Sequence, residues 1–143
     1  MTLRILVPVD DTLASFRTQQ YLIRMKESLR PTVTLLTVIS MSNLAYRCIP
    51  DFQQEMIRDN ALKMGKLTLE RHAEEYAAAG ILFDTILEKG DDPGAVICAV
   101  ARRQGVEMIC LSPSNSSEMS DLVFGSVANY VTHHAPCPVL LVR

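Results

Sequence analysis

The sequence lacks several features that mark common classes of protein. It has no tryptophan, only 6% aromatic residues, and no apolar run near the ~20 residues that span a bilayer. Basic residues are not in excess, because 14 Lys and Arg stand against 16 Asp and Glu among 143 residues, a net charge of −2. The pI of about 5.9 argues against a nucleic-acid binder, whose domain pI usually exceeds ~9. We therefore expect neither a membrane nor a nucleic-acid partner.

Features of secreted and metal-binding proteins are also missing. The apolar stretch over residues 3–9 is short and is followed at once by Asp10 and Asp11, whereas a signal peptide has a longer apolar region and a small-residue cleavage site. The four cysteines are widely spaced, with no CxxC pair, so neither a disulfide scaffold nor a zinc site is indicated. We expect a cytoplasmic protein with reduced thiols, in which Cys98 and Cys110 are buried within apolar runs.

The sequence does not contain the usual motifs of nucleotide-dependent or hydrolytic enzymes. It has no GxxxxGK[ST] phosphate loop, no GxSxG nucleophile elbow, and no glycine in the turn after residues 3–9 that a dinucleotide-binding GxGxxG requires. His133 and His134 end a predicted helix, where positive charge suits the helix dipole. His72 lies among charged residues, which predicts a solvated side chain. We expect no catalytic residue and no metal ligand, and hence no enzyme.

What the sequence does contain is a regular alternation of short apolar runs with longer amphipathic ones. The apolar runs predict five strands, over residues 3–9, 33–39, 81–88, 106–111 and 139–142. Helices are predicted from Asp11 or Thr12 to Leu29, over 51–79, over 94–104 behind an Asp92-Pro93 cap, and over 122–134. This length and pattern predict a single domain over residues 1–143.

Strands that alternate with helices build an open, parallel, doubly wound α/β sheet with helices on both faces. Right-handed crossovers favour the strand order 3-2-1-4-5, which reverses between the first and fourth strands. Ligands bind such sheets at the carboxyl ends of the strands beside the reversal. The segments there are residues 8–11 and the polar residues 112–120, and we expect Gly125 and Ser126, early in the last helix, to face the same crevice.

Two segments at the ends of the chain carry a specific pattern. The first is Ile5-Leu6-Val7-Pro8-Val9-Asp10, and the second is Gly125-Ser126-Val127 followed by HAPCPVLLV over residues 134–142. Together with Gly90, Asp92 and Pro93 in the middle of the chain, they resemble the universal stress protein family over the whole length. The resemblance implies the sheet order given above, and a non-catalytic regulatory domain that forms a cytoplasmic homodimer.

One branch of that family binds ATP or AMP through Gly-x-x-Gly, nine residues, and Gly-Ser/Thr. In this sequence Gly125 and Ser126 match the end of the motif, whereas Ser112 and Asn115 replace its first two glycines. The resemblance also implies that Asp10 meets the adenosine portion and that Val38 lies against adenine. The full set of expected nucleotide-binding residues is Pro8, Val9, Asp10, Val38, Ser112, Asn115, Gly125, Ser126 and Val127.

The two departures bear on which ligand fits. Glycine permits positive φ and a close approach of backbone to phosphate, whereas Ser112 adds a Cβ there. Asn115 is the non-glycine residue best suited to a left-handed position. No Lys or Arg lies between residues 103 and 143, while Glu118 and Asp121 lie in the loop itself. AMP or a smaller anion therefore fits more easily than ATP, which would need Mg²⁺ to offset its charge.

The last strand predicts a contact with a second copy of the chain. Between Val139 and Val142 the residues are all apolar, and in the expected order this strand lies at the edge of the sheet. Apolar edges are usually paired or covered. Self-pairing about a twofold axis gives a closed dimer, and the alternative is that the loop over residues 40–50 covers the edge.

Three other functions are compatible with the same fold. The domain can be an interaction module that binds no nucleotide and acts through protein partners in the stress response. It can be a nucleotide hydrolase that holds Mg²⁺ at Asp10 or Asp11, but no basic residue nearby stabilises phosphoryl transfer. It can also be a flavin carrier, although few aromatic residues are present to stack on a flavin.

Overall fold

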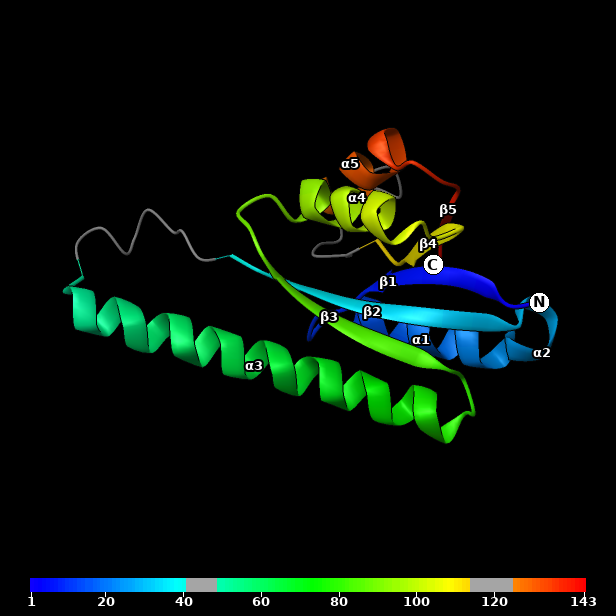
Figure 1. Ribbon diagram of the computed structural model, residues 1–143, viewed down its shortest axis with the longest axis horizontal. Coiled ribbons are helices and arrows are strands. Elements are labelled where there is room, and N and C mark those ends of the chain that lie inside the picture. The colour runs from blue at the N-terminus through cyan, green and yellow to red at the C-terminus, as the bar shows by residue number, and fades with distance from the viewer. Residues whose placement is uncertain (41–48, 114–124) are drawn as a thin grey trace.

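The computed structural model describes residues 1–40, 49–113 and 125–143. Its strands form one sheet in the order β3-β2-β1-β4-β5, and every pair is parallel (Figure 1). The strands are β1 (Leu3–Pro8), β2 (Pro31–Ile39), β3 (Phe83–Lys89), β4 (Met108–Leu111) and β5 (Val139–Leu141). This arrangement confirms the predicted α/β fold and the reversal of strand order between β1 and β4.

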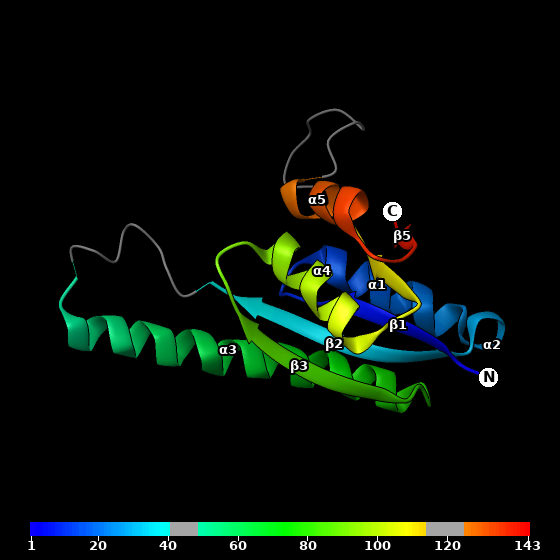
Figure 2. The same ribbon diagram turned by 45° about the horizontal axis from the view of Figure 1, so that its top comes forward.

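Helices cover both faces of the sheet, as predicted (Figures 1 and 2). They are α1 (Leu13–Arg24), α2 (Lys26–Leu29), α3 (Asp51–Ala78), α4 (Pro93–Gln104) and α5 (Ser126–His134). Because side chains alternate along a strand, Ile5 and Val7 of β1 pack in the core beside α1 and α3, whereas Leu6 packs in the core beside α4 and α5. Two apolar cores therefore sandwich the sheet.

Several strands are shorter than predicted because apolar side chains continue beyond the hydrogen-bonded ladder. β3 begins at Phe83 rather than residue 81, although Ile81 is buried in the core. β4 begins at Met108 rather than residue 106, because the Val106 N–H bonds back to Ala101 at the end of α4. Burial of a side chain and backbone hydrogen bonding within the sheet are separate properties. The hydrophobic periodicity of the sequence predicts burial only.

The ends of α4, the start of α3 at Asp51 and the end of α5 at His134 agree with prediction, whereas the first helix differs. Asp92 accepts a hydrogen bond from the Ala95 N–H at 3.2 Å, and Gly105 ends α4 in a left-handed conformation. The single helix predicted up to residue 29 is instead divided at Met25 into α1 and α2. Thr12 lies at the N-cap of α1 but makes no side-chain cap hydrogen bond.

The last helix was predicted over residues 122–134 and begins at Ser126. Gly125 precedes it with φ +75°, so this glycine is a cap residue and not part of the helix. Positive φ is strained for residues with a Cβ, which explains why glycine suits this position. Residues 122–124 lie outside the described part of the chain.

Helix α3 extends beyond the sheet at its N-terminal end (Figure 1). No residue before Gly65 in this helix is buried, and the side chains of Phe52 and Met56 are 63% and 66% exposed. Its buried stripe is confined to the C-terminal half, at Gly65, Thr68, Leu69, His72 and Tyr76. Among the described residues no helix is both long enough and apolar enough to cross a membrane.

Candidate functional site

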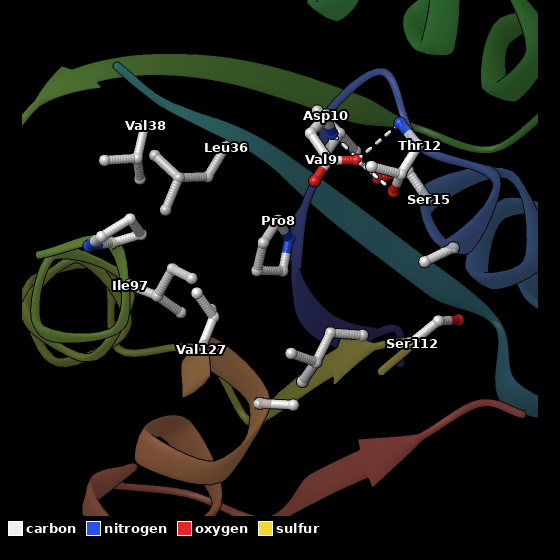
Figure 3. A pocket seen from close by; sticks show the side chains of 14 residues that line it. Pro8, Val9, Asp10, Thr12, Ser15, Leu36, Val38, Ile97, Ser112 and Val127 are labelled. Carbon is white, nitrogen blue, oxygen red and sulfur yellow. Dashed lines mark hydrogen bonds between the residues drawn. The ribbon is translucent and has the colours of Figure 1, made fainter. Parts of the chain in front are cut away.

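A pocket of about 220 Å³ opens at the carboxyl ends of β1 and β4, beside the reversal of strand order (Figure 3). This is the place where ligands bind in open α/β sheets. The turn after β1 and the start of α1 form one wall, β2 and α4 form the opposite wall, and the start of α5 closes it. The pocket is therefore built from elements far apart in the sequence.

The structure brings most of the predicted site residues together around this pocket. Those that line it are Pro8, Val9, Asp10, Val38, Ser112 and Val127. Gly125 and Ser126 are not among the lining residues, although they directly precede Val127. Asn115 lies outside the described residues. The roles of all these residues in binding a nucleotide stay predictions.

Asp10 is held in a fixed orientation by its own turn. Its Oδ1 accepts hydrogen bonds from the Thr12 N–H at 2.8 Å, from Thr12 Oγ1 at 2.5 Å and from Ser15 Oγ at 3.0 Å. The Asp10 N–H in turn donates to Ser15 Oγ at 2.8 Å (Figure 3). The Oδ2 atom makes no hydrogen bond with any described residue. One carboxylate oxygen thus fixes the side chain, and the other is open to a ligand.

Behind this turn, His72 is buried, and the prediction that it is solvated is wrong. The side chain is 1% exposed; Nε2 lies 3.3 Å from the Asp10 carbonyl oxygen and Nδ1 lies 2.7 Å from Gln19 Oε1. Burial lowers the pKa of His72, and the nearby Asp10 opposes that shift. The charged sequence neighbours were misleading, because position 72 shares a helix face with buried Leu69 and Tyr76.

Ser112, which replaces the first glycine of the motif, is directed away from the centre of the pocket (Figure 3). Its Oγ is hydrogen-bonded to Thr18 Oγ1 of α1 at 2.7 Å, and Thr18 is buried. The Ser112 side chain, expected to lie against the ligand, instead joins the end of β4 to α1 through its Oγ. Replacing glycine by serine therefore leaves the pocket open at this position.

The N-terminus of α5 presents backbone donors at the pocket. The first intrahelical hydrogen bond runs from the Asn129 N–H to the Gly125 carbonyl at 3.1 Å, so the N–H groups of Ser126, Val127 and Ala128 precede it. Val127 and Ala128 also line the pocket. Free N–H groups and the helix dipole favour an anion at this end of a helix. The lining contains no Lys or Arg among the described residues.

Comparison with known proteins identifies the family. The model of the universal stress protein family matches residues 1–143. The chain belongs to the universal stress protein family. The universal stress protein YxiE of Bacillus subtilis is 30% identical over 109 residues, which are 76% of this chain and 72% of YxiE.

Two solved structures share the fold of this family member. The hypothetical protein MJ0577 superposes with a TM-score of 0.82 at 22% identity, over 99% of this chain and 96% of the other. A universal stress protein family protein from Arabidopsis thaliana, with AMP bound, superposes with a TM-score of 0.73 at 18% identity, over 98% and 90% of the two chains.

Part of the pocket of this universal stress protein is not predicted by its sequence. Leu36 and Ile97 add to its apolar wall, and Thr12 and Ser15 orient Asp10. Leu36 had a usable signal, because it lies two residues before Val38 and so points to the same face of β2. The hydroxyls of Thr12 and Ser15 carried no comparable signal, since many turns contain such residues.

The three described cysteines of this family member, Cys98, Cys110 and Cys137, lie in or against the apolar cores, and Cys48 lies outside the described residues. Cys98 and Cys110 are buried, which confirms their prediction. Burial raises the pKa of Cys110 to about 12, and it also raises the pKa values of Cys98 and Cys137. These thiols are therefore protonated at neutral pH. In the described part of the chain, no three His, Cys, Asp or Glu side chains gather in a way that suits a metal ion.

Proposed function

We propose that this chain is a non-catalytic regulatory protein of the stress response that binds AMP in the pocket beside Asp10 and acts as a cytoplasmic homodimer. The observation that carries the nucleotide part is the pocket itself, which combines Asp10 with an apolar wall at the reversal of strand order. The AMP held by the Arabidopsis thaliana protein of the same fold supports the ligand class.

Each part of AMP has a matching group in the pocket. The apolar wall of Leu36, Val38 and Ile97 suits a purine ring, because pockets for such ligands are mostly apolar with a few placed polar groups. The open Oδ2 of Asp10 suits a ribose hydroxyl, which is a hydrogen-bond donor. The phosphate suits the free N–H groups at the start of α5.

Charge favours a nucleoside monophosphate over a triphosphate. The described pocket residues include no Lys or Arg, and Asp10 brings a negative charge. A triphosphate places several charges in this site, and each close like-charge pair costs on the order of a few kcal/mol at an effective dielectric constant near 20. We therefore propose AMP as the first ligand to test and expect ATP to bind only together with Mg²⁺.

Binding is tested by titration calorimetry with AMP, ADP and ATP, the last with and without Mg²⁺. Asp10→Asn keeps an acceptor at Oδ1 for the turn and removes the carboxylate charge. We expect roughly 10- to 100-fold weaker AMP binding, which corresponds to the loss of one charged hydrogen bond. Asp11→Asn is the matched control, because Asp11 does not line the pocket. Its affinity should stay within about twofold of wild type.

Two results would contradict the nucleotide proposal: no heat with any nucleotide, or equal losses in the Asp10→Asn and Asp11→Asn variants. Absence of binding by an intact dimer would favour the alternative of a module that acts through protein partners. Release of phosphate from ATP by the wild type, lost in Asp10→Asn, would contradict the non-catalytic role.

A further inference from the structure

Three polar side chains support the turn at Asp10 from behind. Thr37 of β2 donates to the Val9 carbonyl at 3.1 Å, and the His72 ring of α3 lies 3.3 Å from the Asp10 carbonyl. Thr68, one helical turn before His72, donates to Asp11 Oδ1 at 2.8 Å. These supporting side chains are buried, and none of them lines the pocket. Consecutive residues of the turn are thus fixed from outside the site.

The contacts of His72 determine where its proton lies. A carbonyl oxygen only accepts hydrogen bonds, so the contact with the Asp10 carbonyl is a hydrogen bond only when Nε2 carries the hydrogen. In the neutral ring Nδ1 is then an acceptor, and the Gln19 amide must turn its NH₂ group toward it, because amide oxygen and nitrogen are assigned from such networks. The Phe16 ring, stacked at 4.7 Å between centroids, holds the imidazole in this plane.

We propose that His72 is a positioning residue of the nucleotide site, whose Nε2–H holds the Asp10 carbonyl so that the Asp10 carboxylate keeps the orientation a ligand needs. This inference rests on the proposed function. A ligand that meets an ordered turn does not lose binding free energy to ordering it. The geometry also links α3, through His72 and Thr68, to a pocket that no described residue of α3 lines.

The wild-type protein provides the first test. Nitrogen NMR of the ¹⁵N-histidine-labelled protein at neutral pH should show His72 as a neutral ring with its proton on Nε2. A neutral ring with the proton on Nδ1 would overturn the proposal, because Nε2 would then have no hydrogen to donate to Asp10. This measurement does not depend on nucleotide binding or on any variant that must fold.

Three substitutions at His72 separate positioning from packing. His72→Gln places its amide nitrogen near the position of Nε2 and keeps a donor for Asp10, whereas His72→Asn is too short and His72→Phe has no donor. We expect AMP affinity to fall about tenfold in His72→Asn and His72→Phe, because one hydrogen bond is lost. In His72→Gln the affinity should stay within about twofold of wild type. Leu69→Ala, on the same buried face, is the control for lost stability alone.

Amide hydrogen exchange supplies a readout that needs no ligand. The Thr12 N–H is bonded to Asp10 Oδ1, so it should exchange faster in His72→Phe than in wild type or Leu69→Ala. If wild type binds no AMP, the proposed function fails, and this exchange result still decides whether His72 positions the turn. Unchanged Thr12 exchange in His72→Phe would overturn the inference, as would an equal loss of affinity in Leu69→Ala and His72→Phe.

Discussion

Hydrogen bonds made by a few polar atoms fix the geometry of the turn at Asp10. The Oδ1 atom of Asp10 accepts from both Thr12 and Ser15, and these hydrogen bonds restrict the rotation of the side chain. A buried polar group without a partner costs about 1–3 kcal/mol. The pairing of His72 with Asp10 and Gln19 therefore stabilises the fold and the turn together. Losing one partner destabilises the other.

The buried His72 predicts a pH dependence of stability. Burial lowers its pKa below the ordinary value of 6.5, so the unfolded chain takes up a proton before the folded one, and the free energy of unfolding falls as the pH drops through 6.5 toward the folded pKa. One group contributes at most about 1.4 kcal/mol per pH unit. The charged groups around the ring are the carboxylates of Asp10 and Asp11 and the guanidinium of Arg71.

Urea unfolding of wild type and His72→Gln at pH 7.5, 6.5 and 5.5 checks this expectation. The decrease toward pH 5.5 should be smaller in His72→Gln than in wild type. Leu69→Ala is the matched control, because it lies on the same buried face of α3 and lowers stability without removing a titratable group, so it should keep the wild-type slope. Equal slopes for wild type and His72→Gln would show that other groups cause the pH dependence.

Residues that a motif or a strand end specifies were found from the sequence, and residues that act through tertiary contacts were not. Asp10 and Val38 line the pocket as predicted, Asp10 because a strand end fixes where it lies and Val38 because the family resemblance named its position. His72 was assigned to solvent from its charged neighbours, yet its partner Asp10 is 62 residues away. No local pattern reports a hydrogen bond of that sequence separation.

At the scale of elements, α4 and α5 pack closely at a glycine. A Cβ built on Gly94 would lie 2.8 Å from Tyr130 Cδ1 and 2.9 Å from Tyr130 Cβ. The Tyr130 ring is also stacked on His134 with 4.1 Å between centroids, which limits its movement. Ile97 of α4 and Val127 of α5 both line the pocket, so this glycine sets the spacing of two pocket walls.

We expect Gly94→Ala to lower the free energy of unfolding by about 1–3 kcal/mol, the usual cost of overpacking, even though alanine is the better helix former. Urea unfolding measures the loss. The Tyr130→Ala background is the control, because the substitution at Gly94 should cost less when the opposing ring is gone. The same cost in both backgrounds would assign the effect to the backbone of α4 instead of this contact.

Element boundaries show the limit of sequence periodicity at this scale. The cap at Asp92 and the end of α4 at residue 104 were predicted correctly, since the cap residue and the glycine that follows the helix are local signals. The break between α1 and α2 at Met25 was not predicted. Helix α2 then ends at Arg30, which has φ +47°. This left-handed residue leads directly into Pro31, whose fixed backbone disfavours a helical residue before it.

At the scale of the whole molecule, the two edges of the sheet differ in charge. The β3 edge carries Asp84, Glu88 and Lys89, and charged side chains oppose edge-to-edge pairing. The β5 strand, Val139–Leu141, carries none. Its position at the edge of the sheet is as predicted, and pairing of two copies through it stays a prediction. The charge difference favours β5 as the edge that pairs.

The register of β5 allows that pairing to be tested without disturbing the monomer. The Pro138 carbonyl accepts from the Ile109 N–H, and the Val142 N–H donates to the Leu111 carbonyl. The backbone N–H and C=O groups of the even-numbered residues of β5 therefore point toward β4. Backbone groups alternate in direction along a strand, and the N–H of Leu141 therefore points outward. Proline at position 141 removes one outward donor, and proline is tolerated where the N–H faces solvent.

Wild type should have about twice the 15.9 kDa mass of one chain by light scattering at micromolar concentration, whereas Leu141→Pro should be a folded monomer. Leu141→Ala shortens the same side chain but keeps the N–H, so it should remain dimeric and separates lost packing from lost pairing. Leu140→Pro removes a hydrogen bond to β4 instead and should lower the free energy of unfolding by about 1–3 kcal/mol, the cost of leaving a buried β4 carbonyl without its partner. A dimeric Leu141→Pro, or a monomeric wild type, would place the pairing surface elsewhere or exclude a dimer.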